Sequence, residues 1–209
     1  MQAIRALLTA FGSFPGAPVN PTMAIARLVK LRHGRRLARL GIDLHTAELP
    51  VEYAGAEQRA RDLIAAMKPD VVLHLGLAAR RKRLSFETRA RNRLNVLHPD
   101  AERRRAGRMT VEANGPATRA SRAPVRRCVR AIACAGAACA PSIDAGDYLC
   151  NQTLYASLGT QAPSVAFLHV PRPRRPRARR RNGPRRIALA QMADGAAAAL
   201  IEMAKAARR

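Results

Sequence analysis

The chain has 209 residues, of which 48% are hydrophobic, so it can bury a sizeable core without disulfides or metal ions. No apolar run reaches the roughly eighteen residues that cross a bilayer, and Arg5 and Gly12 interrupt the apolar start, which argues against a signal peptide. The four cysteines show neither a C-x-x-C pair nor zinc-like spacing, so we expect reduced thiols. These features predict one domain over residues 1–209, in the cytoplasm and not in a membrane.

The charge of the chain is strongly positive, because 38 Lys and Arg residues outnumber 14 Asp and Glu residues and give a formal net charge of +24. Such a balance is typical of proteins that bind nucleic acid. Much of the excess lies in PRPRRPRARRRNGPRR, residues 171–186, whose composition predicts a solvated basic loop. With no tryptophan and 3% aromatic residues, the chain has little to stack on bases, so we do not expect specific nucleic-acid binding. Electrostatic binding of phosphates through the loop stays an alternative.

Strand and helix patterns alternate over the first 76 residues. Short apolar runs closed by Gly or Pro predict strands, and apolar residues at helical spacing predict the helices between them. The predicted strands cover residues 4–10, 42–50 and 70–76, and the predicted helices cover residues 22–40 and 56–67. This alternation favours an α/β fold, with a largely parallel sheet and helices on its faces.

The second part of the chain begins with a polar, arginine-rich segment, residues 78–123, that shows no clear period. We expect loops there, or an excursion over the edge of the sheet. The alternation of helices and strands then resumes. The predicted elements are helices at 123–136, 150–158 and 187–207, a strand at 164–170, and a strand or turn at 142–147.

Active sites of open α/β sheets gather at the carboxyl ends of strands, where loops meet helix N-termini. Cys150 opens a predicted helix, whose free N–H groups and dipole stabilise a thiolate. His169 ends a predicted strand, where its imidazole can accept the thiol proton and later protonate a leaving amine. Glu87 is an isolated acid among the arginines between Arg80 and Arg93, and it is the candidate that orients the ring.

Each of these residues also has a structural interpretation. A lone cysteine is more often a small buried hydrophobic residue than a nucleophile, and Glu87 can simply balance its arginine neighbours. His74, the rival base, lies inside the run DVVLHLG and is interpreted as a core histidine. The motifs of phosphate loops, dinucleotide sites, zinc proteases and serine hydrolases do not occur, so we predict neither a cofactor nor a metal.

Five segments spread over residues 6–171 stand out together. They are LLTAFGSFPGAPVNPT, ELPVEYAGAEQ, KPDVVLHLGLAARRKRLSFETRARN, DAGDYLCNQTLYASL and AFLHVP. The opening block TAF-x-x-F-x-G-x-x-VNP and the block AG-x-Y-x-CN are the most specific. In this order the segments resemble the motifs of the pyrrolidone-carboxylate peptidases, the pyroglutamyl peptidase I family.

The resemblance implies a cytoplasmic cysteine peptidase whose partners are peptides with an N-terminal pyroglutamate, which it removes. It also implies a three-layer α/β/α sandwich around a twisted, largely parallel but mixed sheet, often assembled as a homotetramer. Carried over residue by residue, the family's nucleophile falls on Cys150, its general base on His169 and its orienting acid on Glu87.

The two phenylalanines with which this family flanks the pyroglutamyl ring fall on Phe11 and Phe14, and its pocket glutamine falls on Leu77. A five-membered lactam carries no charge, so a flat apolar slot selects it over a charged N-terminus, whose ammonium would lose water without gaining a partner. Leu77 can replace the glutamine if the main chain makes the contact. Ordinary core packing is the alternative for both phenylalanines.

Three features depart from the family's pattern. LAAR at residues 77–80 stands where many members have Gln-Ala-Gly-Gly, and the segment after His169 is unusually basic. Asp144 and Asp147 lie where the family tends to show neutral residues, and a carboxylate near Cys150 would oppose thiolate formation. Two alternatives therefore stay open: a cysteine hydrolase that acts on another amide, and an inactive or retargeted homologue that binds polyanions through the basic loop.

Overall fold

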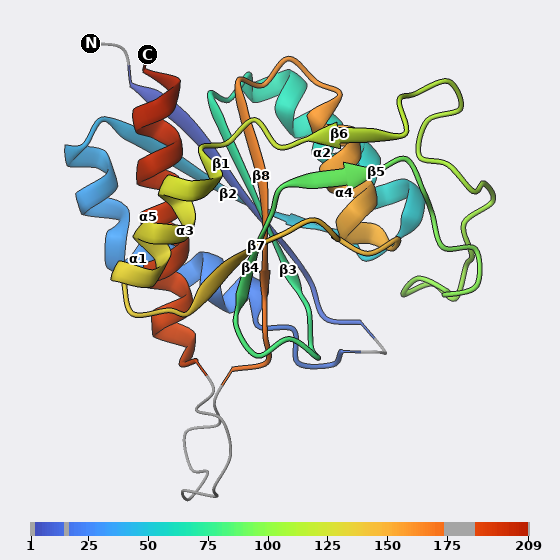
Figure 1. Cartoon of the computed structure of the whole chain (residues 1–209), viewed down its shortest axis with the longest axis horizontal. Helices are drawn as coiled ribbons and strands as arrows, with labels where there is room; N and C mark the ends of the chain where they lie inside the picture. The colour runs from blue at the N-terminus through green and yellow to red at the C-terminus, as the bar shows by residue number, and fades with distance from the viewer. Residues whose placement is uncertain (1–2, 15–16, 174–186, 209) are drawn as a thin grey trace, which may run out of the picture.

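The computed structural model describes residues 3–14, 17–173 and 187–208. Its main sheet contains the strands β1 (Ile4–Phe11), β2 (Ile42–Leu49), β3 (Val71–Leu77), β4 (Leu84–Glu87), β7 (Cys139–Ser142) and β8 (Ser164–Val170). These six strands follow the order β2-β1-β3-β8-β4-β7 (Figure 1). The first four in this order are parallel, whereas β4 is antiparallel to β8 and parallel to β7.

Helices cover both faces of the sheet (Figure 1). One face carries α1 (Thr22–Arg39), α3 (Val125–Cys134) and α5 (Leu189–Ala207), and the other carries α2 (Tyr53–Met67) and α4 (Leu149–Leu158). The predicted α/β class, with a largely parallel but mixed sheet between two helical layers, is confirmed.

The side chains of each strand divide between two cores, because successive residues of a strand point to opposite faces. In β8, Ala166, Leu168 and Val170 belong to the core under α1, α3 and α5. Phe167 belongs to the core under α2 and α4. His169 shares the face of Phe167, and their ring centroids lie 4.7 Å apart. The predicted candidate base therefore faces the layer that contains α4.

Most predicted elements are confirmed with small shifts at their ends, and β8 is confirmed at residues 164–170. α2 begins earlier than predicted, at Tyr53, because the Tyr53 N–H donates a hydrogen bond to Asp100 Oδ2 (3.2 Å) from a distant loop. A cap supplied by another segment leaves no local pattern in the sequence. The strand or turn predicted at 142–147 overlaps β7 at Ser142 alone.

The prediction of loops for residues 78–123 is wrong in part. β4 lies within this segment as an internal strand between β8 and β7, and all its residues are buried. A ribbon of β5 (Arg89–Arg91) and β6 (Thr118–Ala120) also forms there and lies beside α4 (Figure 1). β4 spans only LSFE, with basic runs on both sides, so no alternating pattern announces it.

The predicted basic loop at residues 171–186 falls largely on residues 174–186, which lie outside the described residues. Within the described ranges, no helix is both long enough and apolar enough to cross a membrane. The single domain over residues 1–209 stays a prediction.

Asn151 joins α4 to the β5–β6 ribbon. It is fully buried, its Oδ1 accepts a hydrogen bond from the Arg91 N–H (2.8 Å), and its Nδ2 donates to the carbonyls of Arg91 (2.8 Å) and Arg93 (2.9 Å). These three bonds fix the start of α4 against the segment that follows β4.

We expect Asn151→Ala to lower the free energy of unfolding by about 2–4 kcal/mol, because each buried polar group left without a partner costs about 1–3 kcal/mol. Urea denaturation measures the change. Asn114→Ala, at an exposed asparagine, is the matched control and should leave stability nearly unaltered. Equal stabilities of the two variants would contradict the prediction.

His74 lies in β3 between two hydroxyl groups and is fully buried. Its Nδ1 is 2.6 Å from Thr9 Oγ1, and its Nε2 is 3.0 Å from Ser157 Oγ. Burial lowers the pKa of His74 to about 3. The structure therefore supports its interpretation as a neutral core histidine.

Because the pKa of His74 lies below the unfolded value of about 6.5, the unfolded chain binds this proton more readily than the folded chain. The stability that neutral His74 contributes is therefore present above pH about 6.5 and is lost as the pH falls towards 3. We expect this loss to approach about 1.4 kcal/mol per pH unit. In urea denaturation across this range, the free energy of unfolding should depend less steeply on pH for His74→Gln than for wild type. His45→Gln, at an exposed histidine, is the control and should behave as wild type. Identical dependences would rule out the shift.

Candidate active site

Glu87 and His169 form a buried pair across two neighbouring strands. Ser85 of β4 lies opposite His169 of β8, so Glu87 lies diagonally across from the imidazole on the same face. Glu87 Oε1 is 2.7 Å from His169 Nδ1. Glu87 is fully buried and His169 is 5% exposed, so the hydrogen bond that holds the ring is shielded from water and strengthened by its low-dielectric surroundings. Donation from Nδ1–H leaves Nε2 as the nitrogen that can exchange a proton.

Arg81 joins this pair, although it is not among the site residues predicted from the sequence. Its Nη1 donates to the same Glu87 Oε1 at 2.6 Å, and its Nη2 donates to the carbonyl of Asp144 at 2.6 Å. One guanidinium therefore joins the acid of β4 to the loop that leads into α4. In the sequence, Arg81 belongs to the basic run RRKR, and nothing local distinguishes it from its neighbours.

The second oxygen of Glu87 differs from the first. Oε2 is buried and has no hydrogen-bond partner among the residues that the structure describes. The guanidinium of Arg81 and the imidazole of His169 thus both bond to the same oxygen, Oε1.

Cys150 is the second residue of α4, and its sulfur lies against the bare backbone of Gly76. A Cβ added to Gly76 would lie 2.8 Å from Cys150 Sγ and 2.6 Å from the ring of Phe167. Gly76 of β3 is the register partner of His169 in β8. The sulfur therefore packs against β3 at the position that neighbours His169 of β8. It fits there because Gly76 has no side chain.

The thiol of Cys150 is not acidic in this environment. Burial, and after it the negative charge of Glu87, raises its pKa to about 12, while Arg81 and the Cys150 N–H act in the opposite direction. Part of the residue is exposed, but it packs against the core under α2 and α4. Burial therefore raises the pKa of the thiol more than the helix N-terminus lowers it, contrary to the expectation of a stabilised thiolate. A base has to remove the thiol proton.

The two aspartates that precede Cys150 contact arginines. Asp144 pairs with Arg91, and Asp147 Oδ2 lies 3.9 Å from Arg93 Nε. The carboxylate whose charge raises the pKa of Cys150 is that of Glu87.

The three residues predicted to bind substrate lie in different surroundings. Phe14 is partly exposed and borders a cavity, whereas Phe11 is 4% exposed and packs in the core under α2 and α4. Thr22 holds the main chain of Phe11, because its Oγ1 accepts from the Phe11 N–H (3.2 Å) and donates to the Phe11 carbonyl (2.9 Å). Leu77 ends β3 opposite Val170 and is partly exposed. The binding roles of all three stay predictions.

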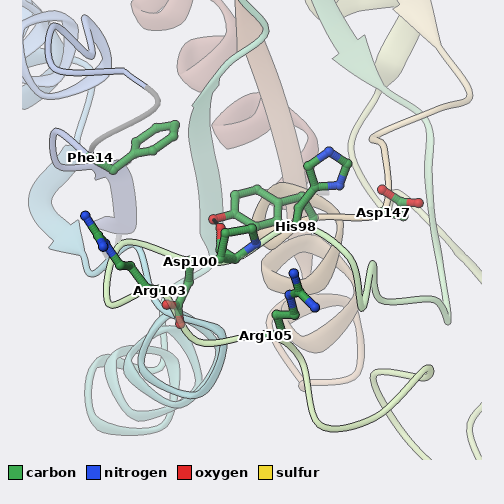
Figure 2. A pocket seen from close by; sticks show the side chains of 8 residues that line it. Phe14, His98, Asp100, Arg103, Arg105 and Asp147 are labelled. Atoms are coloured by element: carbon green, nitrogen blue, oxygen red, sulfur yellow. Dashed lines mark hydrogen bonds between the residues drawn. The ribbon is translucent and has the colours of Figure 1, made fainter.

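The cavity beside Phe14 has a volume of about 690 Å³. Figure 2 shows Phe14 at one end and His98 and Asp147 at the other. Tyr148, the N-cap residue of α4, also borders it and precedes Cys150 by two residues. The complete lining is Phe14, His98, Pro99, Asp100, Arg103, Arg105, Asp147 and Tyr148. A molecule bound here would lie beside the first turn of α4.

Known proteins share both the sequence pattern and the fold. The model of the family "Pyroglutamyl peptidase" matches residues 4–205. A pyrrolidone-carboxylate peptidase of Streptomyces coelicolor is 34% identical over 172 residues, which cover 80% of this chain and 77% of that protein. One of Chromobacterium violaceum is 32% identical over 165 residues, which cover 79% and 76%.

Among solved structures, the pyrrolidone carboxyl peptidase from Thermus thermophilus matches with a TM-score of 0.81 and 33% identity, over 94% of this chain and 99% of that one. The extent of these matches and the match to the family model lead to one conclusion. The chain belongs to the pyroglutamyl peptidase family of cysteine-type peptidases.

Proposed function

We propose that this chain hydrolyses the amide bond after an N-terminal pyroglutamate, with Cys150 as nucleophile, His169 as general base and acid, and Glu87 as the anion that orients the imidazole. The observation that carries the proposal is the buried Glu87–His169 pair, next to the strand position, Gly76, against which the Cys150 sulfur packs. Membership of the pyroglutamyl peptidase family supports the choice of substrate.

The first half of the proposed reaction transfers the pyroglutamyl group to sulfur. His169 Nε2 takes the proton of Cys150 Sγ while the sulfur attacks the carbonyl carbon of the pyroglutamyl residue. Negative charge develops on the carbonyl oxygen, and N–H groups in the first turn of α4 are suited to bind it, since no side chain caps that end. The C–N bond then breaks, and His169 protonates the departing amine.

The second half releases the product. A water molecule gives a proton to His169 Nε2 and attacks the thioester carbonyl, the C–S bond breaks, and the proton returns to the sulfur. The imidazole becomes positively charged in each half, and the buried carboxylate of Glu87 stabilises that charge. This stabilisation favours proton transfer from a thiol whose own pKa is raised.

Selection of the pyroglutamyl ring rests on its lack of charge. In this proposal the partly exposed ring of Phe14 forms an apolar surface that accepts the uncharged lactam, whereas a charged ammonium would lose water against it. Phe11 supports the base of this loop from the core, and the main chain of Leu77 contributes to the ring pocket in this proposal.

Arg81 acts in this proposal as a positioning residue. One of its hydrogen bonds holds the Glu87 carboxylate, and the other fixes the loop at Asp144 that leads to the nucleophile. It also lowers the pKa of Cys150, against the effect of Glu87.

The polyanion-binding alternative depends on residues 174–186, which lie outside the described residues. No feature of the described part of the chain favours it over hydrolysis. A homotetramer and a cytoplasmic location stay predictions.

We expect Cys150→Ala to lower turnover of a pyroglutamyl-aminocoumarin substrate by roughly a thousandfold or more, because the covalent route is lost. Glu87→Gln should lower it by roughly a hundredfold or more, because the anion that stabilises the imidazolium is removed. Fluorescence of the released aminocoumarin measures both. Cys134→Ala, at an exposed cysteine of α3, is the matched control and should retain full turnover. Wild-type turnover no higher than that of Cys150→Ala would end the proposal.

We expect Arg81→Met to lower kcat/KM roughly tenfold or more and to move alkylation of Cys150 by iodoacetamide to higher pH, since a charge that lowers the pKa of the thiol is removed. For Arg81→Lys, the pH dependence of alkylation should lie between those of wild type and Arg81→Met, because lysine keeps the charge but cannot make both contacts. Arg83→Met supplies a control in the same basic run. An unchanged alkylation profile in Arg81→Met would show that Arg81 has no electrostatic role.

A further inference from the structure

The cavity beside Phe14 is larger than a pyroglutamyl ring requires. Its volume of about 690 Å³ is in the range of pockets that enclose whole small ligands. One five-membered lactam fills only part of such a space. If the ring lies against Phe14, the rest of the cavity is available to the residues that follow it in a peptide.

The walls of this cavity are held in place from several sides. Tyr148 O–H donates to the carbonyl of Pro99 (3.0 Å), and its ring packs edge-on against Tyr53 with centroids 5.3 Å apart. Tyr148 also occupies the N-cap position of α4, so this wall is continuous with the helix that carries Cys150. The cavity therefore lies beside the start of the helix that carries the proposed nucleophile.

The acids of the lining are already bonded to protein groups. Asp100 accepts hydrogen bonds from the N–H groups of Tyr53 (3.2 Å), Glu102 (3.0 Å) and Arg104 (2.9 Å). Asp147 accepts from Asn95 Nδ2 (3.2 Å), and Arg93 lies 3.9 Å away. Both carboxylates therefore already have hydrogen-bond donors within the protein.

The cations of the lining are in the opposite situation. The side chains of Arg103 and Arg105 are exposed, and neither forms an ion pair or a side-chain hydrogen bond with another described residue. Figure 2 shows Arg103 on the side of Phe14 and Arg105 below His98. Arg103 lies in the turn that Asp100 fixes, where it takes a left-handed φ of 61°, and Arg105 follows directly after this turn. The lining thus presents two exposed guanidinium groups without partners among the described residues, whereas both of its carboxylates already accept hydrogen bonds.

We infer that this cavity binds the part of the substrate that follows the pyroglutamate, and that Arg103 and Arg105 select peptides that carry a carboxylate there. The inference rests on the proposed function and adds the class of its substrate. The carboxylate can be an Asp or Glu side chain or the free C-terminus of a short peptide, since a guanidinium binds both alike.

Two matched pairs of substrates test the inference and separate these sources. Pyroglutamyl-glutamate amide is compared with pyroglutamyl-glutamine amide, and pyroglutamyl-alanine with its amide. We expect kcat/KM to be roughly fivefold higher for the charged member of at least one pair, which is the size of one exposed ion pair. The pair that shows the difference identifies the carboxylate.

Variants assign the preference to the two arginines. In the pair that shows the difference, the ratio is kcat/KM of the charged member over that of the neutral member. Arg105→Gln should lower this ratio towards one, and Arg105→Glu should lower it below one. Arg103→Asn should also reduce the ratio, since asparagine tolerates the left-handed conformation at this position. Arg59→Gln, at an exposed arginine of α2, is the control that should keep the wild-type ratio.

Ratios near one in both pairs would overturn the inference, while turnover of pyroglutamyl-aminocoumarin would leave the proposed function intact. An equal loss for both members of a pair in Arg105→Gln would also overturn it, since that pattern indicates a structural role. Calorimetric binding of the same peptides to Cys150→Ala repeats the comparison without turnover. Equal affinities for the charged and neutral members would count against the inference in the same way.

Discussion

One carboxylate oxygen, Glu87 Oε1, accepts hydrogen bonds from both Arg81 and His169 at the centre of this structure. Glu87 is fully buried, and a buried anion is tolerated only where charged or polar partners compensate its lost hydration. The fold therefore has to deliver an acid, an imidazole and a guanidinium to one point. The strand order β3-β8-β4 does this, because Arg81 follows β3, His169 is the penultimate residue of β8, and Glu87 ends β4.

The same arrangement leaves a place for sulfur. β3 lies on the other side of β8 from β4, and at the register position of His169 it presents Gly76. Cys150 can pack there because no side chain occupies the space. Asn151, the next residue, bonds to the ribbon that follows β4, so the start of α4 is tied to the chain segment that also carries the acid.

Much of this could be predicted from the sequence because the patterns were local. SVAFLHV is apolar enough to identify β8 and to place His169 at its end, and the helix after Cys150 is equally clear. β4 could not be predicted, since four residues between basic runs become a strand only through pairing with β8 and β7. Arg81 and the Asp100 cap of α2 depend on contacts between distant segments, which no periodicity reveals.

The charges described above differ in their exposure to solvent. The antiparallel course of β4 pairs Glu87 with Phe167, two residues further into β8 than His169, and Glu87 is fully buried, whereas the cavity residues Arg103 and Arg105 are exposed. Dissolved ions screen exposed charges over about 10 Å at moderate ionic strength but reach buried ones far less. Salt should therefore weaken the proposed choice among peptides while leaving the proposed proton transfers at the buried pair almost untouched.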